Sequence, residues 1–100
     1  MYYIYILYSP SVDKYYVGHT DNVKRRVVEH NESYRITYTC KSRPWILKAV
    51  FKCSEDRGKT MKLERYIKTL KNRKIIEKLI DGDAMAGKLA QLIRVPHVRD

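Results

Sequence analysis

Two short tyrosine motifs near the start of the chain carry residues that could do chemistry. They are Tyr-Ile-Tyr at residues 3–5 and Tyr-Val-Gly at residues 16–18, and a helix-like segment with Arg26 and His30 follows directly. A guanidinium binds phosphate through paired N–H donors, and an imidazole exchanges protons near neutral pH. A phenol can orient a water molecule, but with a pKa of about 10 it needs help to act as a base. The combination predicts a site for a phosphate group.

The spacing of these residues predicts that they converge. Arg26 and His30 are four residues apart, so they share one face of the predicted helix. Gly18 lies only a few residues before that helix, which places Tyr16 near the helix N-terminus, where backbone N–H groups favour an anion. Tyr5, on the partner strand, can lie beside Tyr16. Two phenols, a guanidinium and an imidazole would then surround one phosphate-sized space.

The elements that must hold this site follow from hydrophobic patterns and turn residues. Aromatic and apolar runs predict strands over 2–8, 15–18 and 45–53, with a turn over 9–14 that makes the first two an antiparallel hairpin. The region over 31–44 is expected to be an irregular loop. Helices are expected from Thr20 or Asp21 to about Asn31, from Thr60 to Leu70, over 73–80 and, as a short piece, within 84–93. We therefore predict an α+β fold with a small three-stranded mixed or antiparallel sheet flanked by helices, in the order β-β-α-β-α-α.

Charge is the strongest global indication of a partner. The 100 residues include 21 Lys and Arg against 11 Asp and Glu, a net charge of +10, which favours a polyanion such as nucleic acid. The length indicates one domain. There is no apolar run long enough for a membrane span, the start is a poor signal peptide, and two cysteines make no disulfide framework, so no membrane association and a cytoplasmic location are expected.

At this point the chain resembles the GIY-YIG nucleases. The two tyrosine motifs look like the motifs that name the family, and Arg26 and His30 follow at the family's helix spacing. The segment over 61–68 is similar to the one that supplies the family's metal-binding glutamate, which falls on Glu64. Tyr3 stands where the name has Gly, Val17 stands where it has Ile, and a late asparagine of some members has no counterpart after residue 80. The closest likeness is to small stand-alone bacterial members, similar to the catalytic module of the excision-repair incision subunit.

The resemblance implies a GIY-YIG-like nuclease domain over residues 1–82, with 83–100 as a short helix and tail of the same domain. It implies a DNA endonuclease that uses one divalent cation, Mg²⁺ with Mn²⁺ as a substitute, held by Glu64. Arg26 would stabilise the phosphate, and Tyr5 or Tyr16 would orient or deprotonate the attacking water, with His30 accepting the proton. The sequence does not assign these two roles between the tyrosines.

Further basic side chains are candidates for binding the nucleic-acid backbone. They are His19, Lys62, Arg65, Lys68 and Lys71. The ordinary alternative for Glu64 is a surface pair with Lys68 one helical turn on. The alternative function is a non-catalytic nucleic-acid-binding module that keeps the nuclease fold, whereas a protein-interaction domain fits the charge poorly. RNA as the ligand, a protein partner that targets the substrate, the preferred DNA structure and the oligomeric state are left open.

Overall fold

The computed structural model describes residues 1–32, 41–83, 85 and 87–96, so most of the loop predicted over 31–44 and the end of the tail lie outside the described residues. The elements, in chain order, are β1 (Tyr2–Ser9), β2 (Lys14–Thr20), α1 (Val23–Glu32), β3 (Ile46–Ser54), α3 (Arg57–Thr69), α4 (Arg73–Asp81), a 3-10 helix (Gly87–Gln91) and β4 (Ile93–Val95). This α+β architecture was predicted. Within the described ranges, no helix is long and apolar enough to cross a membrane.

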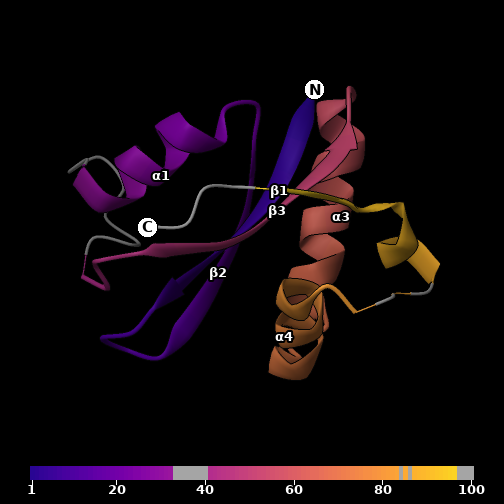
Figure 1. The fold of residues 1–100 in the computed structure, drawn as a ribbon. Coiled ribbons are helices and arrows are strands. Elements are labelled where there is room, and N and C mark those ends of the chain that lie inside the picture. The colour runs from indigo at the N-terminus through magenta and orange to yellow at the C-terminus, as the bar shows by residue number, and fades with distance from the viewer. Residues whose placement is uncertain (33–40, 84, 86, 97–100) are drawn as a thin grey trace.

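The sheet has β1 near its centre and β2 at one edge. The strand order is β2-β1-β3-β4, and each neighbouring pair is antiparallel. Successive residues of a strand point to opposite faces, and all four residues over 4–7 of β1 are buried, so both faces of the sheet are covered. Figure 1 shows α1 on one side of the sheet and α3 with α4 on the other.

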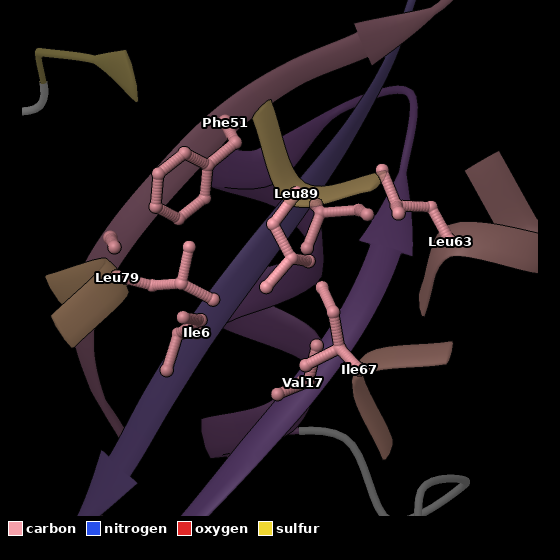
Figure 2. Packing of buried hydrophobic residues seen from close by; sticks show 9 residues of the cluster. Ile6, Val17, Phe51, Leu63, Ile67, Leu79 and Leu89 are labelled. Atoms are coloured by element: carbon pink, nitrogen blue, oxygen red, sulfur yellow. The ribbon is translucent and has the colours of Figure 1, made fainter. Parts of the chain in front are cut away.

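The larger hydrophobic core lies between the sheet and the two C-terminal helices. Figure 2 shows Ile6 of β1 and Val17 of β2 facing Leu63 and Ile67 of α3, with Leu79 of α4 nearby. A smaller core fills the opposite face, where α1 packs against the sheet, and its buried members are Tyr5, Leu7 and Trp45. The strand alternation therefore sends Ile4 and Ile6 toward α3, and Tyr5 and Leu7 toward α1.

The number of strands was predicted wrongly, because the sheet has four strands in place of three. The short helix expected within 84–93 is a 3-10 helix over Gly87–Gln91, followed by β4, which pairs with β3 through Val50 and Val95. A strand of three residues shows no alternation that a sequence pattern could reveal. The side chain of Arg94 adds to the backbone pairing of β4 with β3. The guanidinium of Arg94 donates to the backbone oxygens of Leu79 and Ile80 at 3.0 and 2.8 Å, at the end of α4.

Two helices begin at residues other than those predicted. Asn22 caps α1, because its side-chain oxygen accepts from the backbone N–H of Arg25 at 3.1 Å. Asp56 caps α3, because its carboxylate accepts from two backbone N–H groups of the first turn. Thr60, the predicted cap, is buried inside α3, and its hydroxyl donates to the backbone oxygen of Asp56 at 3.2 Å. Aspartate and threonine both make good caps, so the sequence alone did not separate them.

Candidate active site

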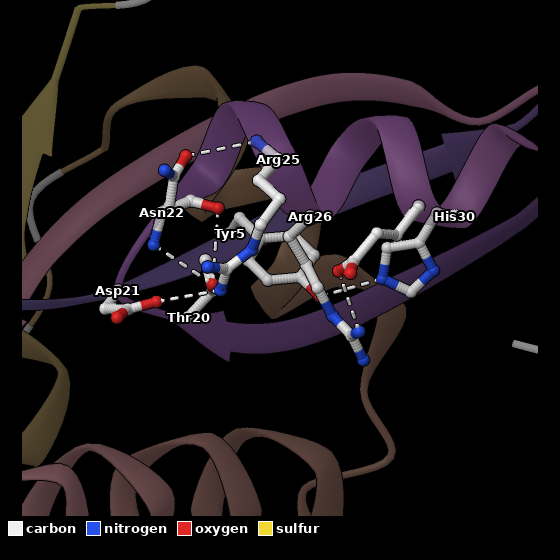
Figure 3. Close-up of polar contacts among 8 residues, drawn as sticks. Tyr5, Thr20, Asp21, Asn22, Arg25, Arg26 and His30 are labelled. Carbon is white, nitrogen blue, oxygen red and sulfur yellow. Dashed lines mark hydrogen bonds and ion pairs between the residues drawn. The ribbon is translucent and has the colours of Figure 1, made fainter. Parts of the chain in front are cut away.

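Tyr5 lies in the interior, between β1 and α1. Its side chain is 1 % exposed, and its hydroxyl shares a hydrogen bond of 2.8 Å with Nε2 of His30 (Figure 3). Gly18 is its cross-strand partner on β2. A Cβ atom at position 18 would lie 2.6 Å from Cζ of Tyr5 and 3.0 Å from Cε1 of Tyr16. The distance to Tyr5 is shorter than a Cβ atom tolerates. Gly18 is therefore needed for close approach of the phenol, and β2 continues past it to Thr20.

His30 is fully buried at the end of α1, with 0 % exposure. Burial, aided by the charge of Arg26, lowers the pKa of His30 to about 4. Its imidazole is therefore neutral near pH 7, with one ring nitrogen able to accept a proton. Burial likewise raises the pKa of Tyr5 well above its usual value, although a hydrogen bond from Arg26 acts in the opposite direction. Tyr5 consequently stays a neutral phenol.

Tyr16 is the half-buried phenol of the pair. Its ring centroid lies 4.8 Å from that of His30 and 6.3 Å from that of Tyr5, so the three rings form one cluster. The predicted convergence is present, but Tyr16 meets the last turn of α1, through His30, and not the helix N-terminus that was predicted. On another side, the ammonium of Lys68 lies 5.0 Å from the Tyr16 ring centroid. Tyr16 is thus the tyrosine of this cluster that meets charged side chains near the surface.

Arg26 lies beside the aromatic cluster on α1. Figure 3 shows its side chain next to Tyr5 and His30. Its guanidinium is partly exposed and pairs with Glu29 at 3.2 Å. Arg25, on the same helix, pairs with Asp21, which precedes the helix, and among the described residues this exposed pair contacts none of the site tyrosines. Arg26 can therefore reach both the buried phenol and an anion arriving from solvent.

Glu64 lies on α3 and is 16 % exposed. Its Oε1 accepts from Nδ1 of His19 at 2.7 Å, and its Oε2 lies 3.2 Å from Nζ of Lys68. The pairing with Lys68, considered as the ordinary alternative, is therefore present. Lys68 contacts both Glu64 and Tyr16, and so joins the carboxylate to the aromatic cluster.

Because β2 lies at the edge of the sheet, side chains from the two faces of the sheet can meet beside it. Tyr16 and His19 are three residues apart on β2, so their side chains leave the strand on opposite faces. Since β2 has a neighbouring strand on one side only, side chains of α3 can extend past its edge. Glu64 and Lys68, four residues apart on α3, reach His19 and Tyr16 in this way.

The side chains present suit a divalent cation that keeps most of its water ligands better than one that is enclosed by protein ligands. In the part of the chain that the structure describes, no three His, Cys, Asp or Glu side chains gather as a metal cage. Mg²⁺ keeps much of its water shell and is often held by one carboxylate together with substrate phosphate. The partly exposed carboxylate of Glu64 meets that requirement, with His19 as a neighbour that can orient it.

The predicted nucleic-acid contacts divide into two groups. Lys68 comes four residues after Glu64, which places it on the same side of α3, whereas Lys71 lies two residues past the end of that helix. Lys62 precedes Glu64 by two residues, a rotation that puts it about 160° away around the helix, and Arg65 lies between these directions. All four are exposed. Their binding role stays a prediction, and of these four only Lys68 is seen in contact with site residues, Glu64 and Tyr16.

Two residues, Arg43 and Trp45, contact the site although the sequence did not predict that they would. Nε of Arg43 donates to the backbone oxygen of His30 at 2.7 Å, and its charge helps to lower the pKa of His30. Trp45, expected only as a core residue, lies with its ring 6.1 Å from that of Tyr16. Arg43 belongs to the predicted loop over 31–44, which has no periodic pattern, and Trp45 is the first residue of the strand predicted over 45–53. Neither position specifies a partner.

Fold and site together define a small α+β domain with phenol, imidazole, guanidinium and carboxylate groups collected at the free edge of an antiparallel sheet. The family model described as the GIY-YIG catalytic domain matches residues 1–78, and the chain belongs to this nuclease family. Comparisons with curated proteins and with solved structures found no significant match.

Proposed function

We propose that this protein is a metal-dependent endonuclease that hydrolyses phosphodiester bonds of DNA. The observation that carries the proposal is the double contact of Lys68, 3.2 Å from Glu64 and 5.0 Å from the Tyr16 ring centroid. It joins the carboxylate of α3 to the aromatic cluster under α1, so one phosphate at the β2 edge could meet both. The net charge of +10 supports a polyanionic substrate.

We assign different roles to the two tyrosines. Tyr5 is buried and its pKa is raised, so it serves as a neutral phenol that positions His30 and Arg26. Tyr16 is half-buried and its ring makes an edge contact with the neutral His30, so it is the better candidate to orient the attacking water. His30, the predicted proton acceptor, is uncharged near pH 7, but its lowered pKa makes it a weak base, so the cation and Arg26 must help to acidify this group.

The negative charge that develops on the phosphate would be stabilised from two sides. Arg26 has a partly exposed guanidinium, and its planar fork matches phosphate oxygens. Glu64 would hold Mg²⁺, with Mn²⁺ as a substitute, and the cation would supply charge neutralisation at the leaving oxygen. Lys68 and Lys71 would bind backbone phosphates next to the scissile bond.

The test is a cleavage panel of nicked, flapped, branched and plain duplex DNA, with an RNA arm, in Mg²⁺ or Mn²⁺. Glu64→Gln should abolish cleavage, and Arg26→Ala should lower the rate about a hundredfold or more, the usual effect of removing a transition-state donor. Glu55→Gln, an exposed carboxylate on the α3 side of the molecule that lies outside the site, is the matched control. Circular dichroism checks that each variant is folded.

Two results would contradict the proposal. If Glu64→Gln cuts as fast as wild type, the carboxylate has no catalytic role. If the wild type binds DNA in a salt-sensitive manner but cuts no substrate in Mn²⁺, the chain is a non-catalytic binding module that keeps the fold. Cleavage confined to the RNA arm would retain the reaction and replace the substrate.

A further inference from the structure

Both oxygens of the Glu64 carboxylate are engaged by neighbouring side chains. Oε1 lies 2.7 Å from Nδ1 of His19, and Oε2 lies 3.2 Å from Nζ of Lys68. An ionised carboxylate only accepts hydrogen bonds, so Nδ1 of His19 carries the proton and donates it. The carboxylate is therefore held from two sides before any cation arrives.

The two contacts differ in rigidity. His19 lies within β2, is paired across the sheet with Ile4, and its ring is 18 % exposed. Its short side chain leaves it little freedom to move away. Lys68 is 44 % exposed and has a flexible four-carbon stem. The His19 contact is thus a fixed feature of the fold, whereas the Lys68 contact can break at low cost.

The two contacts also have opposite effects on the binding of a divalent cation to Glu64. Each carboxylate oxygen has two acceptor positions, so one ring N–H leaves room for a metal ion on the same group. Hydrogen bonds from neighbours that orient a ligating group typically change metal affinity by tenfold or more. An ammonium at 3.2 Å has the opposite effect, because it neutralises the carboxylate and repels a divalent ion.

We propose that His19 and Lys68 tune the cation affinity of Glu64 in opposite directions. His19 is a positioning residue that fixes the carboxylate, and Lys68 is an internal counter-ion that a divalent cation displaces. Once displaced, the ammonium of Lys68 stays close to Tyr16, where it can bind a substrate phosphate. This proposal rests on the function proposed above, because it takes Glu64 as the cation ligand.

The test measures Mg²⁺ binding directly, without DNA and without cleavage. Mg²⁺ is titrated into ¹⁵N-labelled protein, and the amide shifts of α3 and β2 give the dissociation constant. His19→Ala should bind Mg²⁺ about tenfold more weakly, and His19→Asn, which keeps an N–H donor near the position of Nδ1, should recover most of the loss. Lys68→Met should bind about threefold more tightly, the usual size of a partly exposed ion pair.

Two further variants provide the controls. Lys59→Met removes the same charge from the same helix, but position 59 lies five residues before Glu64, about 140° around α3. It should therefore change the affinity less than Lys68→Met does. Glu64→Gln sets the baseline and should abolish the shifts. The amide spectrum itself reports whether each variant is folded.

The proposal is overturned if His19→Ala and Lys68→Met change the affinity in the same direction or leave it unchanged. It is also overturned if Lys59→Met matches Lys68→Met, because the effect is then only general charge, or if Glu64→Gln binds Mg²⁺ like wild type. These results are independent of cleavage. If the two variants change the Mg²⁺ affinity in opposite directions but the protein cuts no substrate, the inference is upheld and only the proposed reaction is contradicted.

Discussion

Acidification is expected to destabilise the fold through His30. The pKa of this group falls from its ordinary 6.5 to about 4 in the folded protein, chiefly because of burial. Between these values the unfolded chain binds a proton that the folded chain does not, so the free energy of unfolding falls as the pH falls. Each pKa unit corresponds to about 1.4 kcal/mol, so the loss is about 3 kcal/mol. The stabilisation is fully present above pH 6.5, is lost toward pH 4, and changes no further below that.

The assay is urea unfolding of wild type and His30→Gln across this pH window, followed by Trp45 fluorescence. Glutamine places an amide near Nε2 and does not titrate, so the difference between the two free energies isolates His30 from the carboxylates. That difference should shrink by about 3 kcal/mol from pH 6.5 to pH 4. Ring-proton NMR of the wild type measures the same pKa without a variant. A pKa close to 6.5, or a difference constant with pH, would refute the reasoning.

Three further perturbations have expected outcomes. Gly18→Ala should cost about 1–3 kcal/mol and depress cleavage, because its Cβ would overlap the Tyr5 phenol; a fully active variant in the cleavage panel would contradict this contact. Arg94→Met should lower the free energy of unfolding by about 1–3 kcal/mol in urea, because it removes the donors to the carbonyls that end α4; an unchanged midpoint would show that β4 is held otherwise. Affinity for duplex DNA should fall steeply with added salt in an anisotropy titration, and affinity that ignores salt would exclude phosphate contacts as the main source of binding.

Much of the fold is visible in local patterns. Aromatic and β-branched runs marked β1, β2 and β3, and helical spacing marked α3 and α4, because each of these elements buries a continuous face. The position of β1 with both faces covered also follows from its unbroken apolar run over 4–7. The fourth strand did not follow, since a three-residue strand is selected by contacts with β3 and α4 rather than by its own sequence.

The candidate site, like the fold, was predicted from the sequence only in part. The sequence determined which groups belong together, because the two tyrosine motifs, the Arg26–His30 spacing and Glu64 are patterns of residue type along the chain. It could not determine that Tyr5 is buried and Tyr16 only half-buried, because both lie on strands of similar composition. Burial depends on what surrounds each ring, and Tyr5 lies on an internal strand whereas Tyr16 lies on an edge strand with a neighbouring strand on one side only.

Only the tertiary structure decided how the carboxylate meets the tyrosines. Glu64 lies 45 residues from His19, and nothing local specifies their hydrogen bond. The sequence assigned His19 to phosphate binding, whereas the structure gives it Glu64 as a partner. The reason is geometric: β2 is an edge strand, so its two faces are joined by side chains of α3 that extend past the edge. Residue types determined the chemistry available to this protein, and the position of β2 in the sheet decided which groups can act on one phosphate.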